Sequence, residues 1–415
     1  MTPKDRVLIT GGGIAGLSLA LHLQQRNIPC QVFEASADIR EIGVGITILP
    51  HAMREFAKMG VDVELTAAGI ENEDSRFFNR FGQLIYAEPR GRAAGYDHPE
   101  VGLHRGKLHQ ALYRKVLAEL GPDAVLTGTR CERVTQTDST VTVEFENSHA
   151  GQASGSATGS VLIACDGINS AIRRQLVPND KLAYTGINMW RGVTVRPPIL
   201  TGRTYMRIGS IRTGKMVIYP IADNVDGNGN QLINWVAEIE TGDKDKPNDW
   251  NQAGELQSFA HLYQDWQFDW LDVPALISSA EQILEYPMVD KEPLEQWTTG
   301  RVTLAGDAAH PMYPRGSNGS AQAVIDARTL AQCLADKGLN DQALQAYEDE
   351  RRETTANIVR TNREQPPDFI NIRVEELVGD RPFDNLDDYI TQQELRDLSD
   401  SYKKVAGFSR PAGPQ

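Results

Sequence analysis

The chain has 415 residues, of which 40% are hydrophobic and 24% charged, as expected for a soluble globular protein with more than one core. A formal net charge of −14 argues against a nucleic-acid binder, because phosphate contacts need a basic face. The four cysteines are scattered and the eight histidines lack ligand spacing, so we expect free thiols and no metal site. Without a long apolar stretch or room for a signal peptide before the first strand, we expect no membrane span and a cytoplasmic location.

The first elements in chain order are a short apolar run and a glycine-rich turn. Residues 6–10 (RVLIT) predict a buried parallel strand, and 11–16 (GGGIAG) open a helix. Gly11 allows a tight turn, Gly13 lets amides approach a pyrophosphate, and Gly16 allows the helix to pack closely on the strand. The free N–H groups of the helix N-terminus suit the phosphates. The predicted cofactor contacts here are Gly11, Gly13, Ile14, Ala15 and Gly16.

A second predicted strand at residues 30–33 delivers an acidic residue, Glu34, with Ala35 beside it. Its separation from the glycines is close to the roughly 20 residues at which dinucleotide sites place a carboxylate on the ribose hydroxyls. The alternative is a glycine turn followed by an unrelated surface glutamate. The order strand, glycines, helix, strand and acid favours a dinucleotide site.

The next segments continue the same domain. The glycine-rich stretch 43–46, with Val44 and Gly45, could pass close to the bound cofactor, and a helix is expected near 51–59. After strands and loops at 68–100, a helix begins near His104 with a stripe of leucine and valine. A strand at 160–164 then ends at Asp166.

The character changes between about residues 184 and 288. Short alternating strands are expected at 206–208, 215–221 and 232–240, with a turn rather than a calcium loop between the last two. A helix should follow, with Leu256, Phe259, Ala260 and Tyr263 on one face, before a further strand at 301–304 and a helix at 321–337. The pattern predicts an α/β fold. We assign a discontinuous dinucleotide-binding domain (1–68, 101–181 and 289–365), a sheet domain (69–100 and 182–288), and C-terminal helices with a tail (366–415).

Three motifs in this order identify a family resemblance: GGGIAG at 11–16, CDGINSAIR at 165–173 and GDAAHPMYPRG at 306–316. The chain resembles the single-component, FAD-dependent aromatic hydroxylases of the para-hydroxybenzoate hydroxylase class. The segments GVGITILP, LHRGKLHQAL, MWRGVT and RVTLAGDAAHPMYPRGSNGSAQA are most similar to the phenazine-hydroxylating members. The resemblance implies a Rossmann-like FAD-binding domain of the glutathione-reductase type, an inserted β-sheet substrate domain and C-terminal helices.

The resemblance also implies non-covalent FAD and a set of contacts. Asp307 would bind the ribityl hydroxyls, unless it is only a helix N-cap. Arg105 would contact the pyrophosphate, and Asp166 with Arg173 would position FAD and NAD(P)H, although Arg173 could be a surface arginine. The loop residues that would face the flavin, or form only a loop with a cap, are Pro314, Gly316, Asn318 and Gly319.

The implied reaction uses a transient NAD(P)H and O₂, because the chain lacks a second strand–GxGxxG–helix unit for the nicotinamide nucleotide. A flavin C4a-hydroperoxide would then hydroxylate a planar aromatic, which could be phenazine- or quinolone-like. Substrate candidates on strands expected to face the flavin, with the neighbouring proline, are Met189, Trp190, Arg191, Tyr219, Trp235 and Pro314. Catalytic candidates are Arg191, Tyr219 and His51, with core packing, a salt bridge and a structural histidine as the alternatives.

Rival functions differ in their motifs. A flavin-dependent halogenase would show WxWxIP, and a Baeyer–Villiger or N-oxygenating enzyme a second GxGxxG; this sequence has neither. A non-enzymatic escort protein with an FAD fold should have a degraded motif around Asp307, which is intact here. An NAD(P)H oxidase or another flavoprotein oxidoreductase stays as the alternative, and the sequence leaves the oligomeric state open.

Overall fold

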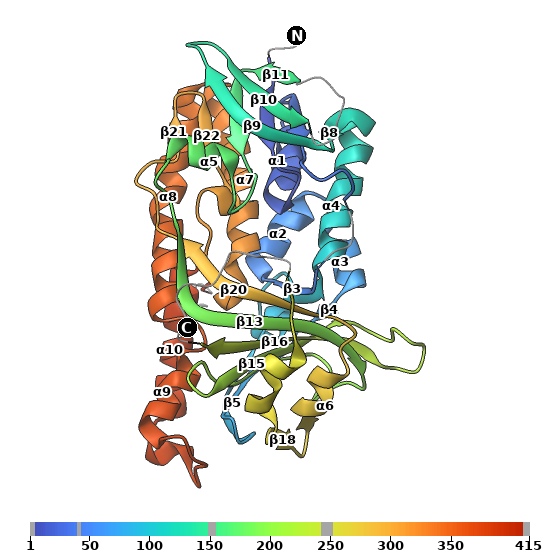
Figure 1. The fold of residues 1–415 in the computed structure, drawn as a ribbon, viewed down its shortest axis with the longest axis vertical. Coiled ribbons are helices and arrows are strands. Elements are labelled where there is room, and N and C mark those ends of the chain that lie inside the picture. Colours follow the sequence, from blue (N-terminus) through green and yellow to red (C-terminus); the bar gives the residue numbers. More distant parts are fainter. Residues whose placement is uncertain (1–4, 40–42, 148–154, 242–251, 410–415) are drawn as a thin grey trace.

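The computed structural model describes residues 5–39, 43–147, 155–241 and 252–409. One end of the elongated molecule holds a parallel sheet with its helices, and the other holds a large antiparallel sheet (Figure 1). The end of the predicted polar tail, residues 410–415, lies outside the described residues.

The first sheet has six strands in the order β21-β22-β12-β1-β2-β8. Its central strand β1 is fully buried and pairs in parallel with β12 and β2, as expected for an apolar run covered on both faces. At one edge of this sheet, β21 and β22 form an antiparallel pair. The strands are β1 (Val7–Thr10), β2 (Cys30–Phe33), β8 (Val125–Leu126), β12 (Val161–Ala164), β21 (Thr298–Thr299) and β22 (Val302–Leu304).

Helices from distant parts of the chain cover this sheet. The helix α1 packs against both α4 and α7, which brings the N-terminal glycine turn beside the third sequence motif. The helix α7 begins three residues earlier than the sequence predicts. The helices of this layer are α1 (Ile14–Gln24), α2 (Pro50–Lys58), α3 (Asp62–Ala68), α4 (Arg105–Leu120), α5 (Ala171–Leu176) and α7 (Asn318–Lys337).

Two small antiparallel sheets flank the layer, with strand orders β11-β10-β9 and β3-β7-β4. The second of them lies between the parallel sheet's helices and the large sheet, because β7 packs on strand β15 of the latter. Their strands are β9 (Thr129–Gln136), β10 (Val141–Asn147), β11 (Ser156–Gly159), β3 (Gly45–Ile48), β4 (Ile70–Glu71) and β7 (Val101–His104).

The large sheet has eight strands in the order β17-β20-β13-β16-β15-β14-β5-β6. Neighbours are antiparallel except β14 and β5, where the chain segment before β7 joins the sheet. The strands are β5 (Asp74–Phe78), β6 (Leu84–Pro89), β13 (Leu182–Arg196), β14 (Thr204–Ser210), β15 (Gly214–Ala222), β16 (Gln231–Glu240), β17 (Gln252–Ala253) and β20 (Ile283–Lys291).

Both faces of this sheet are buried. The inner face, which carries Met189, Tyr219 and Val236, packs toward Tyr313 of the third motif. The outer face, which carries Trp190 and Trp235, packs on residues 256–277. The covering elements are η3 (Leu256–Ser258), η4 (Ala260–Tyr263), β18 (Gln267–Phe268), β19 (Leu271–Asp272) and α6 (Val273–Ser278).

The helix predicted from Leu256 is wrong. The segment forms two short 3₁₀ turns separated by Phe259, whose backbone (φ −134°, ψ −22°) leaves the helical region. The physical reason is tertiary packing: the Phe259 ring lies 5.1 Å from the Trp190 ring and 6.0 Å from that of Trp235. These aromatic contacts outweigh the weak helical preference of the local sequence.

The C-terminal helices α8 (Asp341–Glu364), α9 (Phe369–Val378) and α10 (Gln392–Val405) run along one side of the molecule from the parallel sheet to the large sheet (Figure 1). The helix α9 packs on strands β5 and β14. All four cysteines are free thiols. None of the helices in the described part of the chain is long and apolar enough to span a membrane.

Candidate active site

The glycine turn after β1 combines tight packing with one open position. Gly11 has φ +93°, and a Cβ there would lie 2.3 Å from the carbonyl oxygen of Cys165. A Cβ on Gly16 would lie 2.0 Å from the Gly11 carbonyl oxygen, so both positions need glycine. A Cβ on Gly13 would meet nothing within 4 Å. The turn therefore leaves open space beside Gly13 and the first residues of α1, Ile14 and Ala15, which are half-buried.

Glu34 is tied to this turn at the end of β2. Its two carboxylate oxygens accept hydrogen bonds from the amides of Gly12 and Ser36, each at 2.7 Å. Each oxygen keeps lone-pair capacity for a further donor. Ala35 lies next to Glu34 and is half-buried.

Sequence reasoning missed two residues that shape the turn, Gly12 and His109. The Gly12 amide binds Glu34, and the Gly12 carbonyl oxygen lies 2.6 Å from Nε2 of His109 on α4. The second glycine of GGGIAG was a visible signal, but nothing in the sequence pointed to His109, because α4 is far away in the chain.

The third motif lies directly against the glycine turn. A Cβ on Gly306 would come within 3.0 Å of Ala15 Cβ. Asp307 is accessible to solvent, yet burial raises the pKa of its carboxyl group, while His310 and Arg105 partly offset that rise. A helix N-cap role is wrong for Asp307, since the short turn Gly306–Ala308 is preceded by Ala305 and has no side-chain cap.

Two further predicted residues have different surroundings. Asp166 follows β12 beside Gly11; its Oδ2 accepts from the amide of Ala171, and its buried Oδ1 has no hydrogen-bond partner in the described structure. Burial raises the pKa of Asp166, and a hydrogen bond from Ser170 opposes the shift. Arg105 is exposed at the start of α4, where its amide donates to the Val44 carbonyl oxygen at 3.0 Å.

Arg173 is not the surface arginine that the sequence offers as an alternative. Its side chain is fully buried and forms a bidentate pair with Asp180, at 2.8 Å and 2.9 Å. Its Nη1 also donates to the carbonyl oxygens of Ala308 and Ala309, at 3.0 Å and 2.8 Å. Arg173 therefore holds the turn that presents Asp307.

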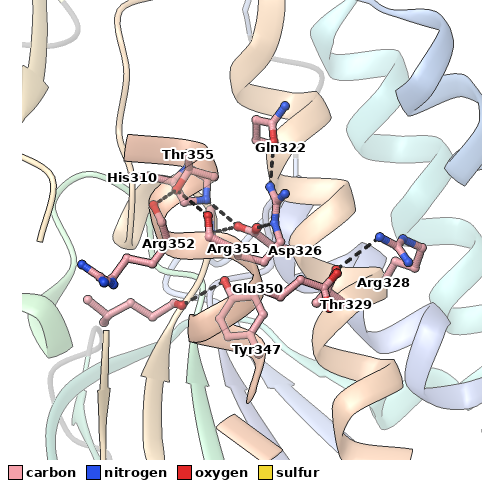
Figure 2. A network of polar contacts seen from close by, with 12 residues as sticks. His310, Gln322, Asp326, Arg328, Thr329, Tyr347, Glu350, Arg351, Arg352 and Thr355 are labelled. Atoms are coloured by element: carbon pink, nitrogen blue, oxygen red, sulfur yellow. Dashed lines mark hydrogen bonds and ion pairs between the residues drawn. The ribbon is translucent and has the colours of Figure 1, made fainter. Parts of the chain in front are cut away.

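A buried polar network supports the same turn from the other side (Figure 2). Asp326 on α7 accepts from the Gly306 amide at 3.0 Å, from His310 Nε2 at 2.5 Å and from Arg351 Nε at 2.8 Å. Arg351 also donates to Gln322 Oε1 at 2.7 Å. Although burial alone would raise the pKa of Asp326, His310 and Arg351 lower it to about 2. The network fixes the turn and α7 as one unit.

The loop after the turn leads into α7 with unusual backbone geometry. Gly316 (φ +75°) and Ser317 (φ +57°) are both left-handed, and α7 begins at Asn318 without a side-chain cap. A Cβ on Gly319 would meet nothing within 4 Å, so the first amides of α7 border open space. Pro314 is exposed and Asn318 is buried.

The inner face of the large sheet forms hydrogen bonds with both the amide and the carbonyl group of Gly45. Asn234 Oδ1 accepts from the Gly45 amide at 2.7 Å, and Arg191 Nη2 donates to the Gly45 carbonyl oxygen at 2.8 Å. A Cβ on Gly45 would lie 2.6 Å from Asn234 Cβ, so glycine is needed here for contact with the sheet. Asn234 was missed by sequence reasoning; Val44 next to Gly45 is buried.

An aromatic pair lies between two arginines on the inner face. The rings of Tyr205 and Tyr219 stack at 4.9 Å with a 9° interplanar angle. The Arg207 guanidinium lies 4.5 Å from the Tyr205 ring centre and 4.9 Å from that of Phe77. Burial raises the pKa of Tyr219, and the nearby Arg191 partly offsets this. Met189 is on the same face.

Among the described residues, the contacts of Arg191 and Arg207 are with a carbonyl oxygen, a hydroxyl group and aromatic rings, and neither has an acidic side chain within ion-pair distance. Arg207 is 5% exposed and donates one hydrogen bond, to Ser75 Oγ at 2.7 Å. The Nε of Arg191 is buried without a hydrogen-bond partner in the described part of the chain. Arg207 is buried and Arg191 is half-buried, and a cation shielded from water without a countercharge is unfavourable unless an anion binds beside it.

Three candidates lie away from this face. Trp235 is fully buried on the outer face, where its Nε1 donates to Thr194 Oγ1 at 3.1 Å, so its predicted substrate contact is wrong; Trp190 is on that face too. His51 on α2 stacks on Phe408 at 5.2 Å, and both ring nitrogens are buried without partners in the described structure. Burial lowers the pKa of His51 to about 4, which disfavours a role as general base.

These residues fit FAD on structural grounds. The open space at Gly13 and Gly319, the unpaired Asp166 oxygen, the accessible Asp307 and the anchored Glu34 carboxylate together offer amides for phosphate and acceptors for hydroxyls. The described residues contain no cluster of histidine, cysteine and acidic side chains that could hold a metal ion.

Known proteins support this interpretation. The chain is 38% identical to the phenazine 1,6-dicarboxylic acid hydroxylase PhzS of Lysobacter antibioticus over 363 residues, which cover 86% of this chain and 89% of that protein. It is 32% identical to the aurachin C monooxygenase/isomerase of Stigmatella aurantiaca, over 85% of this chain and 86% of that one. A 3-hydroxybenzoate 6-hydroxylase of Polaromonas naphthalenivorans is 29% identical, over 90% of each chain.

Solved structures share the fold. A single-residue variant of HpxO from Klebsiella pneumoniae, complexed with FAD, superimposes with a TM-score of 0.76 at 22% identity, covering 99% of this chain and 100% of that one. The expected α/β fold, with an FAD-binding layer and a second sheet, is confirmed. The family model described as "FAD binding domain" matches residues 4–362. The chain therefore belongs to the FAD binding domain family and is an FAD-dependent aromatic hydroxylase.

Proposed function

We propose that the chain is an NAD(P)H- and O₂-dependent monooxygenase that hydroxylates a planar fused or nitrogen-containing aromatic bearing a carboxylate or phenolate. The observation that carries this proposal is the inner face of the large sheet, where the stacked Tyr205 and Tyr219 lie between two arginines without acidic partners among the described residues. Aromatic rings suit a flat substrate, and uncompensated guanidinium groups suit an acidic substituent. The phenazine dicarboxylate named for the Lysobacter relative has both features.

Bound FAD supplies the redox chemistry, accepting electrons from NAD(P)H and activating O₂. The chain supplies position and surroundings. Arg191 and Asn234 hold the Gly45 peptide, so the sheet that would bind the substrate is attached to the segment that would border the flavin. This link restricts the relative motion of the two sheets, so residues from both can be positioned around one reacting site.

The neighbourhood of the substrate ring is apolar as well as charged. Met189, Val217 and Val236 lie on the inner face together with Tyr219. Such a lining excludes water from the reacting atoms, which favours oxygen transfer over loss of the reducing equivalents as hydrogen peroxide. Tyr219 keeps its proton at neutral pH, because burial raises its pKa, and it can donate to a phenolate or carboxylate.

The experiment that tests the reaction is turnover under ¹⁸O₂ with a panel of phenazine carboxylates, quinolones and hydroxybenzoates, each with NADH and with NADPH. We expect one labelled oxygen atom in the product of the preferred substrate. Label taken from water, or oxidation without oxygen insertion, would contradict the monooxygenase proposal. If every compound leaves NAD(P)H consumption matched only by hydrogen peroxide, the NAD(P)H oxidase alternative is correct.

We propose the same FAD contacts that the sequence indicates: Glu34 at the adenosine ribose, Asp307 at the ribityl chain and Arg105 at the pyrophosphate. Asp307→Ala or Glu34→Ala should each weaken FAD binding by roughly 1.5–3 kcal/mol, the range for charge-assisted hydrogen bonds. Titration of the FAD-free protein with FAD measures this directly. Wild-type affinity in either variant would remove that residue from the site.

A further inference from the structure

A tyrosine of the last helix joins both ends of the loop that precedes α7. Tyr402 on α10 is 6% exposed, and its hydroxyl donates to Asn362 Oδ1 at 2.9 Å. The same hydroxyl accepts from Asn318 Nδ2 at 2.7 Å, and Asn362 Nδ2 donates to the Tyr313 carbonyl oxygen at 3.4 Å. One hydroxyl thus connects the start and the end of residues 313–318, which we call the flavin loop.

The same tyrosine also restricts the backbone of the flavin loop by packing. A Cβ on Gly316 would lie only 1.9 Å from the Tyr402 hydroxyl oxygen. Gly316 is therefore pressed against the tyrosine, and Ser317 beside it has a left-handed backbone with φ +57°. A non-glycine residue in this region is strained and persists only when its surroundings impose it. Tyr402 provides such surroundings.

The helix that carries Tyr402 is itself anchored to several parts of the molecule. Glu88 Oε2 accepts from Ser399 at 2.7 Å and from Lys403 at 2.8 Å, which ties α10 to the large sheet. Beyond the helix, the Phe408 carbonyl oxygen accepts from the hydroxyl of Tyr96 at 2.6 Å. The anchoring makes α10 a fixed support, although it lies outside the residues 4–362 that match the family model.

We propose that Tyr402 is a positioning residue for FAD: it fixes the flavin loop so that the first amides of α7 meet the flavin at a set distance. The C-terminal helix is then part of the cofactor site. The inference holds for any substrate, so it goes beyond the proposed reaction. Helix N-terminal amides near a flavin stabilise negative charge on it, so a loosened loop should change both FAD affinity and the flavin potential.

The test compares Tyr402→Phe with the matched control Tyr263→Phe. Like Tyr402, whose hydroxyl also lies 3.4 Å from the Arg315 carbonyl oxygen, Tyr263 is a buried tyrosine with a backbone acceptor, the Lys215 carbonyl oxygen at 3.0 Å. It packs on the outer face of the large sheet, away from the flavin loop. We expect Tyr402→Phe to raise the FAD dissociation constant about tenfold and to shift the midpoint potential of bound flavin, with Tyr263→Phe leaving both at wild-type values. Unfolding of the FAD-free proteins checks that both variants fold.

A wild-type dissociation constant and potential in Tyr402→Phe, or equal changes in both variants, would overturn the proposal. A double-mutant cycle adds a second measurement. Asn362→Ala removes the nearer of two acceptors of the Tyr402 hydroxyl and leaves the Arg315 carbonyl oxygen at 3.4 Å, so the effects of the two substitutions on FAD affinity should be smaller together than their sum. Additive effects would show that Tyr402 does not act through this connection and would reject the proposal.

Discussion

The two faces of the large sheet are both buried, yet they differ in kind. The outer face is apolar: Trp190, Ile218 and Trp235 pack against Phe259 and its neighbours. The inner face places Arg191, Arg207, Lys215, Asn234 and Glu238 among aromatic and aliphatic side chains. Successive residues of a strand point to opposite faces, so Asn234 and Trp235 belong to different surroundings although they are adjacent in sequence.

The difference separates stability from function. Buried charges are unfavourable unless they are paired, and on the inner face only some are: Lys215 lies 2.8 Å from Glu238 and 2.9 Å from Asp368, whereas Arg191 and Arg207 have no acidic partner among the described residues. On the outer face, the half-buried Glu285 carboxylate accepts hydrogen bonds from Asn188 Nδ2 and Trp190 Nε1. We therefore expect substitutions on the outer face to reduce stability and those on the inner face to reduce activity.

The largest expected effect is on the outer face. Trp235→Ala should lower the free energy of unfolding by about 3–5 kcal/mol, because it removes a fully buried aromatic ring and leaves a cavity. The kcat/KM of the protein that remains folded should stay at the wild-type value. Chemical denaturation and steady-state kinetics at low temperature measure the two quantities. A fall in kcat/KM without a loss of stability would show that the two faces are not separate.

The next largest effect is on the inner face. Arg191→Met should reduce kcat/KM for a carboxylated substrate about 100-fold, because a charge-assisted hydrogen bond to a buried anion is lost. The unfolding free energy should fall by about 1–2 kcal/mol, because the variant loses the hydrogen bond to the Gly45 carbonyl oxygen but leaves no unpaired acidic side chain among the described residues.

A neutral amide analogue of the substrate is the control for Arg191. If the arginine acts on the substrate charge, Arg191→Met should affect the amide far less than the carboxylate. Asn234→Ala loosens the same Gly45 peptide without changing charge, so it should affect both compounds equally. Equal losses for the two compounds in Arg191→Met would reduce Arg191 to a support for Gly45.

The sequence predicts local features of this molecule well. The glycine turn and Glu34 follow from rules that act over a few residues, and the structure brings them together through the Gly12 amide. The parallel sheet follows from short, continuous apolar runs such as Val7–Thr10. Alternation in the strands also indicates which residues share a face.

Long-range packing determines the features that local sequence patterns do not predict. Alternation cannot say which face of a doubly buried sheet is inward, so Trp235 was assigned to the substrate although it lies beneath Phe259. The role of Arg173 depends on Asp180 together with carbonyl oxygens of 308 and 309, and that of Tyr402 depends on a loop about 90 residues earlier in the chain. No local pattern encodes such contacts.

A smaller effect should follow from Arg207, which lies on the inner face behind Tyr205. Arg207→Met should reduce kcat/KM for the carboxylated substrate about tenfold, because the cation also acts through the stacked rings and the potential at the site. Arg207→Lys keeps the charge but not the planar stacking, so it should recover part of the loss. If Lys and Met give the same kcat/KM, the charge is irrelevant and only the stacking of Arg207 on Tyr205 and Phe77 matters.

The smallest effect comes from acid and concerns neither face of the sheet. Burial lowers the pKa of His51 and of His22 from 6.5 to about 4, so the folded chain keeps both neutral while the unfolded chain protonates them. The contribution of the two neutral histidines to the free energy of unfolding is then complete above pH 6.5, and it is lost as the pH falls from 6.5 toward 4. Between pH 7.5 and 6 we expect a loss of about 1 kcal/mol per histidine in the free energy of unfolding.

The variant His51→Gln should remove the contribution of His51 to this pH dependence of the free energy of unfolding. The variant His22→Gln should remove the contribution of His22. Asp326, whose pKa is lowered from 3.8 to about 2, contributes a separate loss only below 3.8, so the two processes can be told apart in one titration. Because both histidines lie in helices α1 and α2 of the FAD-binding layer, the Michaelis constant for the substrate should not follow the stability curve. A Michaelis constant that rises as the free energy of unfolding falls would show that the inner face and the helical layer unfold together. The separation of stability from function would then apply only to the two faces of the large sheet.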